Sequence, residues 1–337
     1  MKTQIVYVVV SSERDLFLEE LWASLFSLRI YHPEATVKVL VDAPTAKRIH
    51  NNPALNTMIT EVVTVEVPEE YSPMARSRVI KTTIRNVING PFLYIDTDTV
   101  ICHSLEEIDG IDYDVAAVPD THLPLAQHPF GRSQINRVKH IFGIDISNKE
   151  YYYNGGAMYV ADNELTHKFY RQWYENWKVS SIEKHDNADQ PALNKADMEL
   201  GGIIKCLPDV YNCQLALSLK YFHEAYIVHF FHMGFIKDQS YSPFMGLDIY
   251  REIKKANAIT PHAEELIRNC KSSFATTTMA VGRTQIYYLF SPTGQAFSML
   301  MANSKRWSKT LNWIAGKILK YYRGKNKIKE KLNKNKK

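Results

Sequence analysis

The sequence has few cysteines and no long apolar run, and both shortages narrow the class of protein. Its 337 residues include four cysteines, which form no Cys-x-x-Cys pair and no dense framework, so we expect reduced thiols in a cytosolic setting. No stretch is long and apolar enough to span a bilayer. The apolar run from Ile5 to Val10 is too short for a signal-peptide core and lacks a small-residue cleavage site, so we expect a strand there and no secretion.

Acidic residues are almost missing from the C-terminal end. Residues 301–337 contain 13 Lys and Arg residues and a single acidic residue, Glu330, whereas residues 1–300 contain 28 basic and 35 acidic residues. The net charge of +5 therefore combines a mildly acidic body with a strongly basic tail. Basic charge alone is compatible with nucleic acid, but no recognition fold accompanies it and the body is acidic, so we predict no nucleic-acid partner.

The basic tail also carries many aromatic and aliphatic side chains. Between Phe297 and Tyr322, apolar residues such as Trp307 and Trp313 alternate with Lys and Arg residues. Basic residues interleaved with Trp and Tyr on a helix are typical of attachment to anionic lipid. Each Lys or Arg near the surface contributes about 1 kcal/mol to the binding free energy. We therefore predict an anionic membrane surface as a partner. A helix packed on the body is the alternative, and we expect an irregular basic segment over residues 324–337.

Strands alternate with helices over the first hundred residues. The apolar runs Ile5–Val10, Val37–Val41 and Phe92–Ile95 are separated by helical patterns, one of them from Tyr71 to Val87, and a further strand is expected over Val63–Val67. Such alternation predicts a parallel sheet with right-handed crossovers. In sheets of this kind, ligands bind at the carboxyl ends of the strands.

The run that ends at Ile95 is followed by two carboxylates, Asp96 and Asp98, on either side of Thr97. Four apolar residues without a polar interruption are typical of a strand that is buried on both faces. If the strand geometry persists into Asp98, its period of two places both carboxylates on the same side. Two neighbouring carboxylates can share a divalent cation, so we predict a metal site at this strand end.

Several polar or glycine residues further along the chain follow or interrupt apolar strands. They are Asp120, Asn154-Gly155-Gly156 within an aromatic strand over residues 151–160, Asp189-Gln190, and His229 and His232 followed by Gly234 and Lys237. Adjacent glycines inside a strand indicate either unusual backbone dihedrals or a close approach by another group. Each of these features is weak alone, so their order along the chain carries the interpretation.

Taken together with Ser11-Ser12 after the first strand and a helix carrying Arg78 and Lys81, this ordered set resembles the GT-A nucleotide-sugar glycosyltransferases. It is most similar to the group that includes glycogenin and the bacterial lipooligosaccharide galactosyltransferases, over roughly residues 3–240. The resemblance implies an α/β, Rossmann-like fold with a mostly parallel mixed sheet flanked by helices. It also implies transfer of a hexose from a UDP-sugar, dependence on Mn²⁺, and usually retention of anomeric configuration.

The resemblance divides the chain into three parts and assigns it a place in the cell. Residues 1–245 would form the transferase domain, residues 246–300 would complete it with helices, and residues 301–337 would form the membrane-associating tail. A transferase held at a membrane without a signal peptide would lie on the cytoplasmic face. There it would meet a glycan or lipid-linked saccharide acceptor, as in lipopolysaccharide or capsule synthesis.

The resemblance also assigns roles to single residues. Asp96 and Asp98 would hold the metal with His229, for which His232 is an alternative because the usual His-x-x-Gly spacing is disturbed here. Mg²⁺ is the alternative to Mn²⁺. Ser11, Ser12, Arg78, Lys81, Thr97, Gly234 and Lys237 would contact the nucleotide, with Lys237 at a phosphate oxygen. Asp120, Asn154 and Gly155 would line the donor sugar, Asp189 would hydrogen-bond its hydroxyls, and Gln190 would lie near its anomeric face. An inverting enzyme would instead need a carboxylate base.

Two other interpretations of the Asp96-Thr97-Asp98 motif stay open. The haloacid-dehalogenase phosphatases carry Asp-x-Asp-x-Thr/Val after an apolar run, with the first Asp as nucleophile, and residues 96–100 match this pattern. In that family, however, the motif ends the first strand and a Gly-Asp-x-x-x-Asp follows, and neither is found here. A catalytically silent nucleotide-sugar binder, tethered by its tail, would keep both carboxylates. A calcium loop is excluded, because its sixth position is Ile101 instead of glycine.

Overall fold

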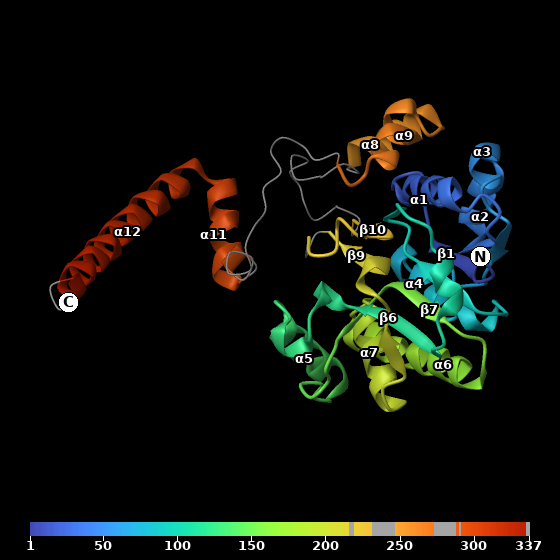
Figure 1. Cartoon of the computed structure of the whole chain (residues 1–337), viewed down its shortest axis with the longest axis horizontal. Coiled ribbons are helices and arrows are strands. Elements are labelled where there is room, and N and C mark those ends of the chain that lie inside the picture. The colour runs from blue at the N-terminus through green and yellow to red at the C-terminus, as the bar shows by residue number, and fades with distance from the viewer. Residues whose placement is uncertain (216–218, 231–246, 273–287, 290, 335–337) are drawn as a thin grey trace. The chain divides into compact units, whose positions relative to one another are not determined.

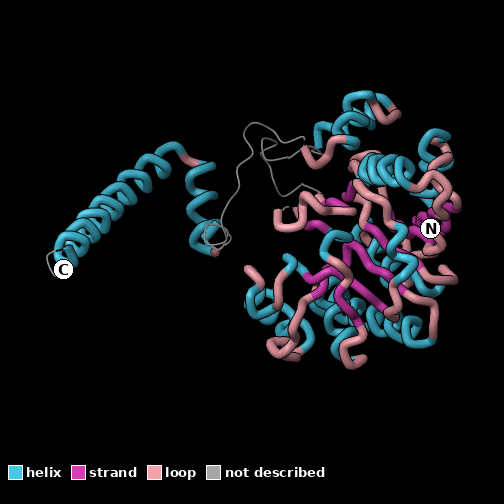
Figure 2. The backbone as a smooth tube through the Cα atoms, in the orientation of Figure 1, coloured by secondary structure: helices cyan, strands magenta, loops and turns pink. Residues whose placement is uncertain are grey.

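The computed structural model describes residues 1–215, 219–230, 247–272, 288–289 and 291–334. The chain forms two compact units, Met1–Thr278 and Met279–Lys337, which are described separately (Figure 1). The first unit is a mixed α/β domain, and the described part of the second consists of helices (Figure 2).

A seven-stranded sheet forms the centre of the first unit, with strand order β3-β2-β1-β4-β7-β6-β8. The strands are β1 Gln4–Val9, β2 Val37–Val41, β3 Glu61–Thr64, β4 Phe92–Ile95, β6 Val115–Pro119, β7 Tyr153–Val160 and β8 Ile204–Cys206. Only β7 runs against the others, because it pairs antiparallel with β4 and β6 while the remaining pairs are parallel. The predicted mostly parallel mixed sheet is therefore confirmed.

Helices cover both faces of this sheet. On one face lie α1 Phe17–Tyr31, α8 Leu247–Ala256 and α9 Pro261–Arg268, and on the other lie α4 Pro73–Thr82, α6 Glu164–Lys178 and α7 Gln190–Glu199. The alternation of side chains along β1 explains the two layers, since Tyr7 and Val9 pack with α1 whereas Val6 and Val8 pack with α4. The central strands are buried on both faces, as their apolar sequences predict.

Two elements begin or end earlier than the sequence pattern indicated. The helix expected over Tyr71–Val87 is α4, which begins after the N-cap Ser72 and ends at Thr82. A short 3₁₀ turn, Ile84–Asn86, follows it. The strand expected over Val63–Val67 is β3, which runs from Glu61 to Thr64, because these are the residues that pair with β2. Such shifts are common, since backbone pairing and caps set the ends of an element while hydrophobic periodicity does not.

Smaller helices complete the first unit. They are α2 Ala43–His50, α3 Pro53–Asn56 and α5 Gly131–Phe142, together with several 3₁₀ turns, among them Asp209–Asn212. The side chain of Asp42 caps α2 by accepting a hydrogen bond from the Thr45 amide at 3.1 Å.

A three-stranded sheet lies beside the main sheet, with order β5-β10-β9. Its strands are β5 Thr99–Ile101, β9 Cys213–Gln214 and β10 Ile227–His229. Strand β5 follows Asp98 directly and pairs antiparallel with β10, which places His229 opposite Thr99. This pairing brings a histidine from late in the chain to the end of β4.

The described part of the second unit contains α11 Pro292–Asn303 and α12 Lys305–Lys334. The helical prediction for the tail is confirmed, but the irregular segment expected over residues 324–337 is wrong as far as Lys334, where α12 ends. The reason is local: Lys, Leu and Glu favour a helix and no proline interrupts them. Among the described residues, none of the helices combines the length and the apolar character needed to cross a bilayer.

Candidate functional site

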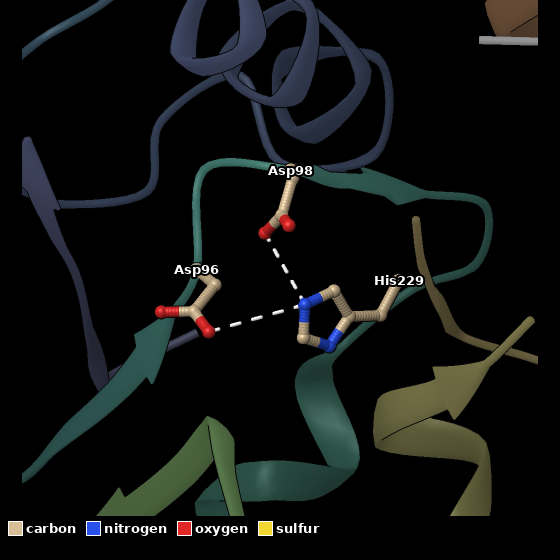
Figure 3. A group of neighbouring side chains, drawn as sticks. All are labelled: Asp96, Asp98 and His229. Atoms are coloured by element: carbon tan, nitrogen blue, oxygen red, sulfur yellow. Dashed lines mark ion pairs between the residues drawn. The ribbon is translucent and has the colours of Figure 1, made fainter. Parts of the chain in front are cut away.

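Two carboxylates and an imidazole converge at the carboxyl end of β4 (Figure 3). His229 Nε2 lies 3.2 Å from Asp98 Oδ1 and 3.9 Å from Asp96 Oδ2. The strand ends at Ile95, so the strand geometry expected through Asp98 does not persist. Both carboxylates nevertheless face the ring, because a bend at residues 97–98 leads into β5 and the Phe230 amide donates to the Asp98 carbonyl at 2.9 Å.

The surroundings of His229 suit a metal ligand. Burial disfavours the charged ring, but the carboxylate of Asp98, and then that of Asp96, outweigh it and raise the pKa of His229. The other ring nitrogen, Nδ1, lies 2.9 Å from Asn212 Oδ1 and is therefore occupied. Two carboxylates and one imidazole form a donor set that suits Mn²⁺ and accommodates Mg²⁺, so the residues present fit a divalent metal.

Lys81 connects this cluster to a second acidic residue. Its ammonium lies 3.0 Å from Asp96 Oδ1 and 3.3 Å from Asp189 Oδ2, and its side chain is only 4% exposed. Arg78 lies one turn earlier on α4 and pairs with Asp189 at 3.2 Å. Burial alone would raise the pKa of Asp189, but Arg78 and Lys81 outweigh it and lower the value to about 2. Asp189 is thus held as a carboxylate at the start of α7.

The two adjacent glycines of β7 differ in what they allow. A Cβ atom at Gly156 would lie 2.4 Å from His229 Cε1, a distance that no side chain tolerates. A Cβ at Gly155 would make ordinary contacts, the nearest to Leu193 at 3.6 Å and Lys81 Nζ at 3.7 Å. The close approach expected from the glycine pair is therefore confirmed at Gly156, where the imidazole packs against the backbone.

Asp120 follows strand β6 directly, Asn154 lies in the neighbouring strand β7, and the two side chains are joined by a hydrogen bond. Asn154 Nδ2 donates to Asp120 Oδ1 at 3.0 Å, and His128 Nε2 lies 2.8 Å from the other carboxylate oxygen. The next residues, Thr121 and His122, have φ values of 59° and 58°, which lie in the left-handed region. Two consecutive non-glycine residues in that region are unusual and store strain beside the candidate site.

Ser11 and Ser12 follow β1 and are held by one acidic residue. Asp15 accepts hydrogen bonds from the hydroxyl of Ser11 at 2.5 Å and from the amide and hydroxyl of Ser12 at 2.8 and 2.7 Å. Arg48 donates to the Ser11 hydroxyl at 2.9 Å. These serines lie at the same edge of the sheet as Asp96, because β1 and β4 are adjacent and parallel. Their predicted contact with the nucleoside stays a prediction.

The remaining predicted residues have mixed outcomes. Thr97 lies half-buried between the two carboxylates, and Gln190 begins α7 directly after Asp189. The roles proposed for both stay predictions. His232, Gly234 and Lys237 lie outside the described residues. His229 is the histidine that the structure places beside Asp96 and Asp98.

Sequence reasoning missed three residues that support this cluster. Asn212 binds the His229 ring, His128 binds Asp120, and the Tyr94 hydroxyl donates to Asp96 Oδ1 at 2.5 Å. Tyr94 lies in β4, two residues before Asp96, which directly follows the strand, so strand periodicity offered a signal for it. Asn212 and His128 carry no such signal, because tertiary packing alone brings them to their partners.

Three solved structures align with most of the chain. Mouse xyloside xylosyltransferase 1 in its apo form has 12% identity to this chain, the alignment covers 68% of this chain and 97% of that one, and the TM-score is 0.46. Galactosyltransferase LgtC in complex with donor and acceptor sugar analogues has 15% identity, with 78% of this chain and 99% of that one covered and a TM-score of 0.48. The glycosyltransferase GlyE of Streptococcus pneumoniae has 15% identity, with 83% of this chain and 67% of that one covered and a TM-score of 0.47. A search of curated protein sequences found no significant match.

The sequence model of glycosyl transferase family 8 matches residues 89–237. The matched segment begins just before β4 and contains Asp96, Asp98, Asp189 and His229. It therefore spans the residues that form the cluster at the end of β4.

Proposed function

Since the chain is a glycosyltransferase of the family 8 type with a GT-A fold, we propose that it transfers a hexose from a UDP-sugar to a saccharide acceptor. The observation that carries this proposal is the cluster of Asp96, Asp98 and His229 inside the family-matched segment. The cluster lies at the carboxyl end of a central strand, which is where open α/β sheets bind their ligands.

We propose that Asp96, Asp98 and His229 hold a divalent metal, with Mn²⁺ favoured over Mg²⁺. When bound, the metal would neutralise the charge that develops on the diphosphate as UDP leaves. The two carboxylates supply the negative charge that attracts a cation, and His229 supplies a neutral nitrogen donor once its proton is displaced. Lys81 already contacts Asp96, so a cationic side chain lies within reach of the space in which a phosphate would bind.

The donor sugar is proposed to bind between Asp189 and the Asp120–Asn154 pair. Arg78 and Lys81 keep Asp189 ionised, so its carboxylate can accept hydrogen bonds from sugar hydroxyls at neutral pH. Gln190 follows it at the first turn of α7, and its amide would lie near the anomeric carbon. We propose retention of configuration, because an inverting enzyme needs a free carboxylate as base and both described candidates, Asp120 and Asp189, are already paired.

The proposed acceptor is a glycan or a lipid-linked saccharide at the cytoplasmic face of a membrane. On α12, Trp307, Leu311, Ile314, Ile318 and Tyr321 recur every three or four residues and share one face. Lys305, Lys309 and Lys320 fall on the opposite face by the same spacing. Most of these apolar side chains are exposed, and a helix with this pattern suits the surface of an anionic bilayer.

The experiment that tests the proposed function combines ligand binding with turnover. Melting temperatures are measured with UDP, GDP, CMP and phosphate, each with Mn²⁺, with Mg²⁺ and with a chelator. We expect stabilisation by UDP that depends on the metal, followed by hydrolysis of one or more UDP-hexoses. A melting temperature that rises with phosphate and Mg²⁺ but does not change with UDP would favour the phosphatase interpretation. Binding of UDP-sugars without hydrolysis or transfer would indicate the silent binder.

A further inference from the structure

A chain of buried polar side chains connects the candidate metal ligand His229 to the Asp120 carboxylate. The links are His229 Nδ1 to Asn212 Oδ1 at 2.9 Å, Asn212 Nδ2 to Asn154 Oδ1 at 3.0 Å, and Asn154 Nδ2 to Asp120 Oδ1 at 3.0 Å. All four residues are buried, and Asn212 is 0% exposed. The four residues come from four different elements of the fold: β10, the turn Asp209–Asn212, β7 and the turn that follows β6.

A backbone amide fixes the direction of this chain. The Gly156 amide can only donate, and it lies 2.8 Å from Asn154 Oδ1, so the oxygen of the Asn154 amide must point this way. Asn212 must then present its Nδ2 group to that oxygen and its own oxygen to His229. An oxygen facing Nδ1 requires that Nδ1 carries the proton. The second ring nitrogen, Nε2, therefore points toward Asp96 and Asp98.

The other end of the chain is fixed in the same manner. The Phe130 amide donates to His128 Nδ1 at 2.9 Å, so His128 Nε2 carries a proton and donates to Asp120 Oδ2. The carboxylate of Asp120 thus accepts from both sides, and no link places two donors or two acceptors face to face. Each of these hydrogen bonds can therefore run in one direction only.

We propose that Asn212 is a positioning residue, which holds the His229 ring so that Nε2 faces the two carboxylates and ties this orientation through Asn154 to Asp120. The inference rests on the proposed function, because it concerns the metal and donor-sugar sites of the same transferase. A ligand imidazole that donates its second ring N–H to a fixed acceptor binds metal more tightly, and loss of that acceptor typically weakens metal affinity 10- to 100-fold. Through its hydrogen bond to Asn154, Asn212 also couples the orientation of the His229 ring to Asn154 and Asp120, the residues that would line the donor sugar.

The first test measures Mn²⁺ affinity by calorimetry without nucleotide. Asn212→Leu removes both hydrogen bonds, and we expect affinity about 10- to 100-fold weaker. Asn212→Asp keeps an oxygen for the ring N–H, so its affinity should fall no more than about threefold. Asn176 is the matched control, because it is another buried asparagine, bonded to Lys195 and Glu199 away from the cluster. Asn176→Leu should leave Mn²⁺ affinity unchanged. Native affinity in a folded Asn212→Leu protein would overturn the inference.

A double-mutant cycle separates positioning from general damage. If Asn212 acts through His229, Asn212→Leu should cause no further loss of affinity in a His229→Ala background. An equal loss in both backgrounds would assign Asn212 a merely structural role. If the leucine variant does not fold, Asn212→Ser takes its place, since its hydroxyl is too short to reach both partners.

A last measurement keeps this inference distinct from the proposed function. In the metal-free protein, we expect a slowly exchanging NMR signal for the His229 Nδ1 proton, present in the native protein and in Asn176→Leu but lost in Asn212→Leu. A native protein that binds no divalent metal yet shows this pattern would defeat the proposed function and keep the assignment of Asn212. A native ring without a protected Nδ1 proton would overturn the assignment itself.

Discussion

Lys81 Nζ lies 3.0 Å from Asp96 Oδ1, so a buried cation and a carboxylate of the candidate metal site form an ion pair. The same ammonium contacts Asp189, and it lies 4.7 Å from the centre of the Tyr94 ring. One side chain from α4 thus joins the end of β4 to the start of α7. This contact links the proposed metal and sugar sites before any ligand is present.

Replacing Lys81 by methionine should destabilise the protein. The change leaves Asp96 and Asp189 close together with only Arg78 to balance them, and breaking a buried ion pair in this way costs about 2–4 kcal/mol. Urea unfolding at pH 7 measures the loss. Lys178 is the control, because its pair with Glu175 is largely exposed and Lys178→Met should change the unfolding free energy by at most about 0.5 kcal/mol. Equal losses of unfolding free energy in both variants would show that the buried ion pairs of Lys81 stabilise the protein no more than the exposed pair of Lys178 does.

Replacing Asp98 by asparagine should weaken metal-dependent UDP binding without unfolding the protein. Removal of one anionic ligand is expected to lower the affinity for UDP in Mn²⁺ by about tenfold or more. Without ligand, the melting temperature should change by only a few degrees, because the side chain is partly exposed. Asp209→Asn is the matched control, since Asp209 also pairs with a histidine, His122, outside the cluster. Unchanged UDP affinity in Asp98→Asn would remove Asp98 from the metal site.

The stability of the protein should depend on Asp189 at acid pH. The folded-state pKa of Asp189 is lowered to about 2 by Arg78 and Lys81 from an ordinary value of 3.8. The stabilisation is therefore complete above the ordinary pKa and is lost as the pH falls toward 2, a contribution of about 2 kcal/mol. The free energy of unfolding is measured between pH 5 and pH 2 for the native protein and for Asp189→Asn. The difference between the two should shrink as the pH falls across this window. A constant difference would contradict the linkage.

Adding one methyl group at Gly156 should displace His229. The new Cβ would overlap the imidazole, so Gly156→Ala should weaken Mn²⁺ affinity by about tenfold or more and cost about 1–3 kcal/mol of stability. Gly155→Ala adds the same methyl one residue earlier, where only ordinary contacts await it, and should change neither quantity by a comparable amount. Similar effects of both substitutions would mean that His229 does not need this close approach.

Removing the tail should separate membrane binding from catalysis. Truncation after Ser304 deletes α12 and its basic residues, so binding to liposomes that contain anionic lipid should be lost while hydrolysis of the UDP-sugar remains. Co-sedimentation with liposomes measures the first quantity. Full-length protein with neutral liposomes, or at high salt, is the control and should bind weakly. Equal binding by the truncated protein would reject α12 as the attachment site.

The sequence alone determined the elements that local patterns control. The apolar runs of β1, β2 and β4 predicted a mostly parallel sheet, and the carboxylates after Ile95 marked the ligand edge, because both features depend on neighbours in the chain. The ordered motifs were also enough to indicate a glycosyltransferase, which the family match to residues 89–237 supports. The ends of β3 and α4 were misplaced, since backbone pairing and capping set them.

Tertiary structure decided which distant side chains meet. The pairing of β5 with β10 placed His229 beside Asp98, and the approach of Gly156 to its ring fixed where that imidazole could lie. No periodicity in the sequence predicts that Asn212 binds this ring, because the hydrogen bond forms only when separate segments pack together. Local patterns thus marked the edge of the sheet at which a ligand binds, and long-range packing chose the residues that form the site there.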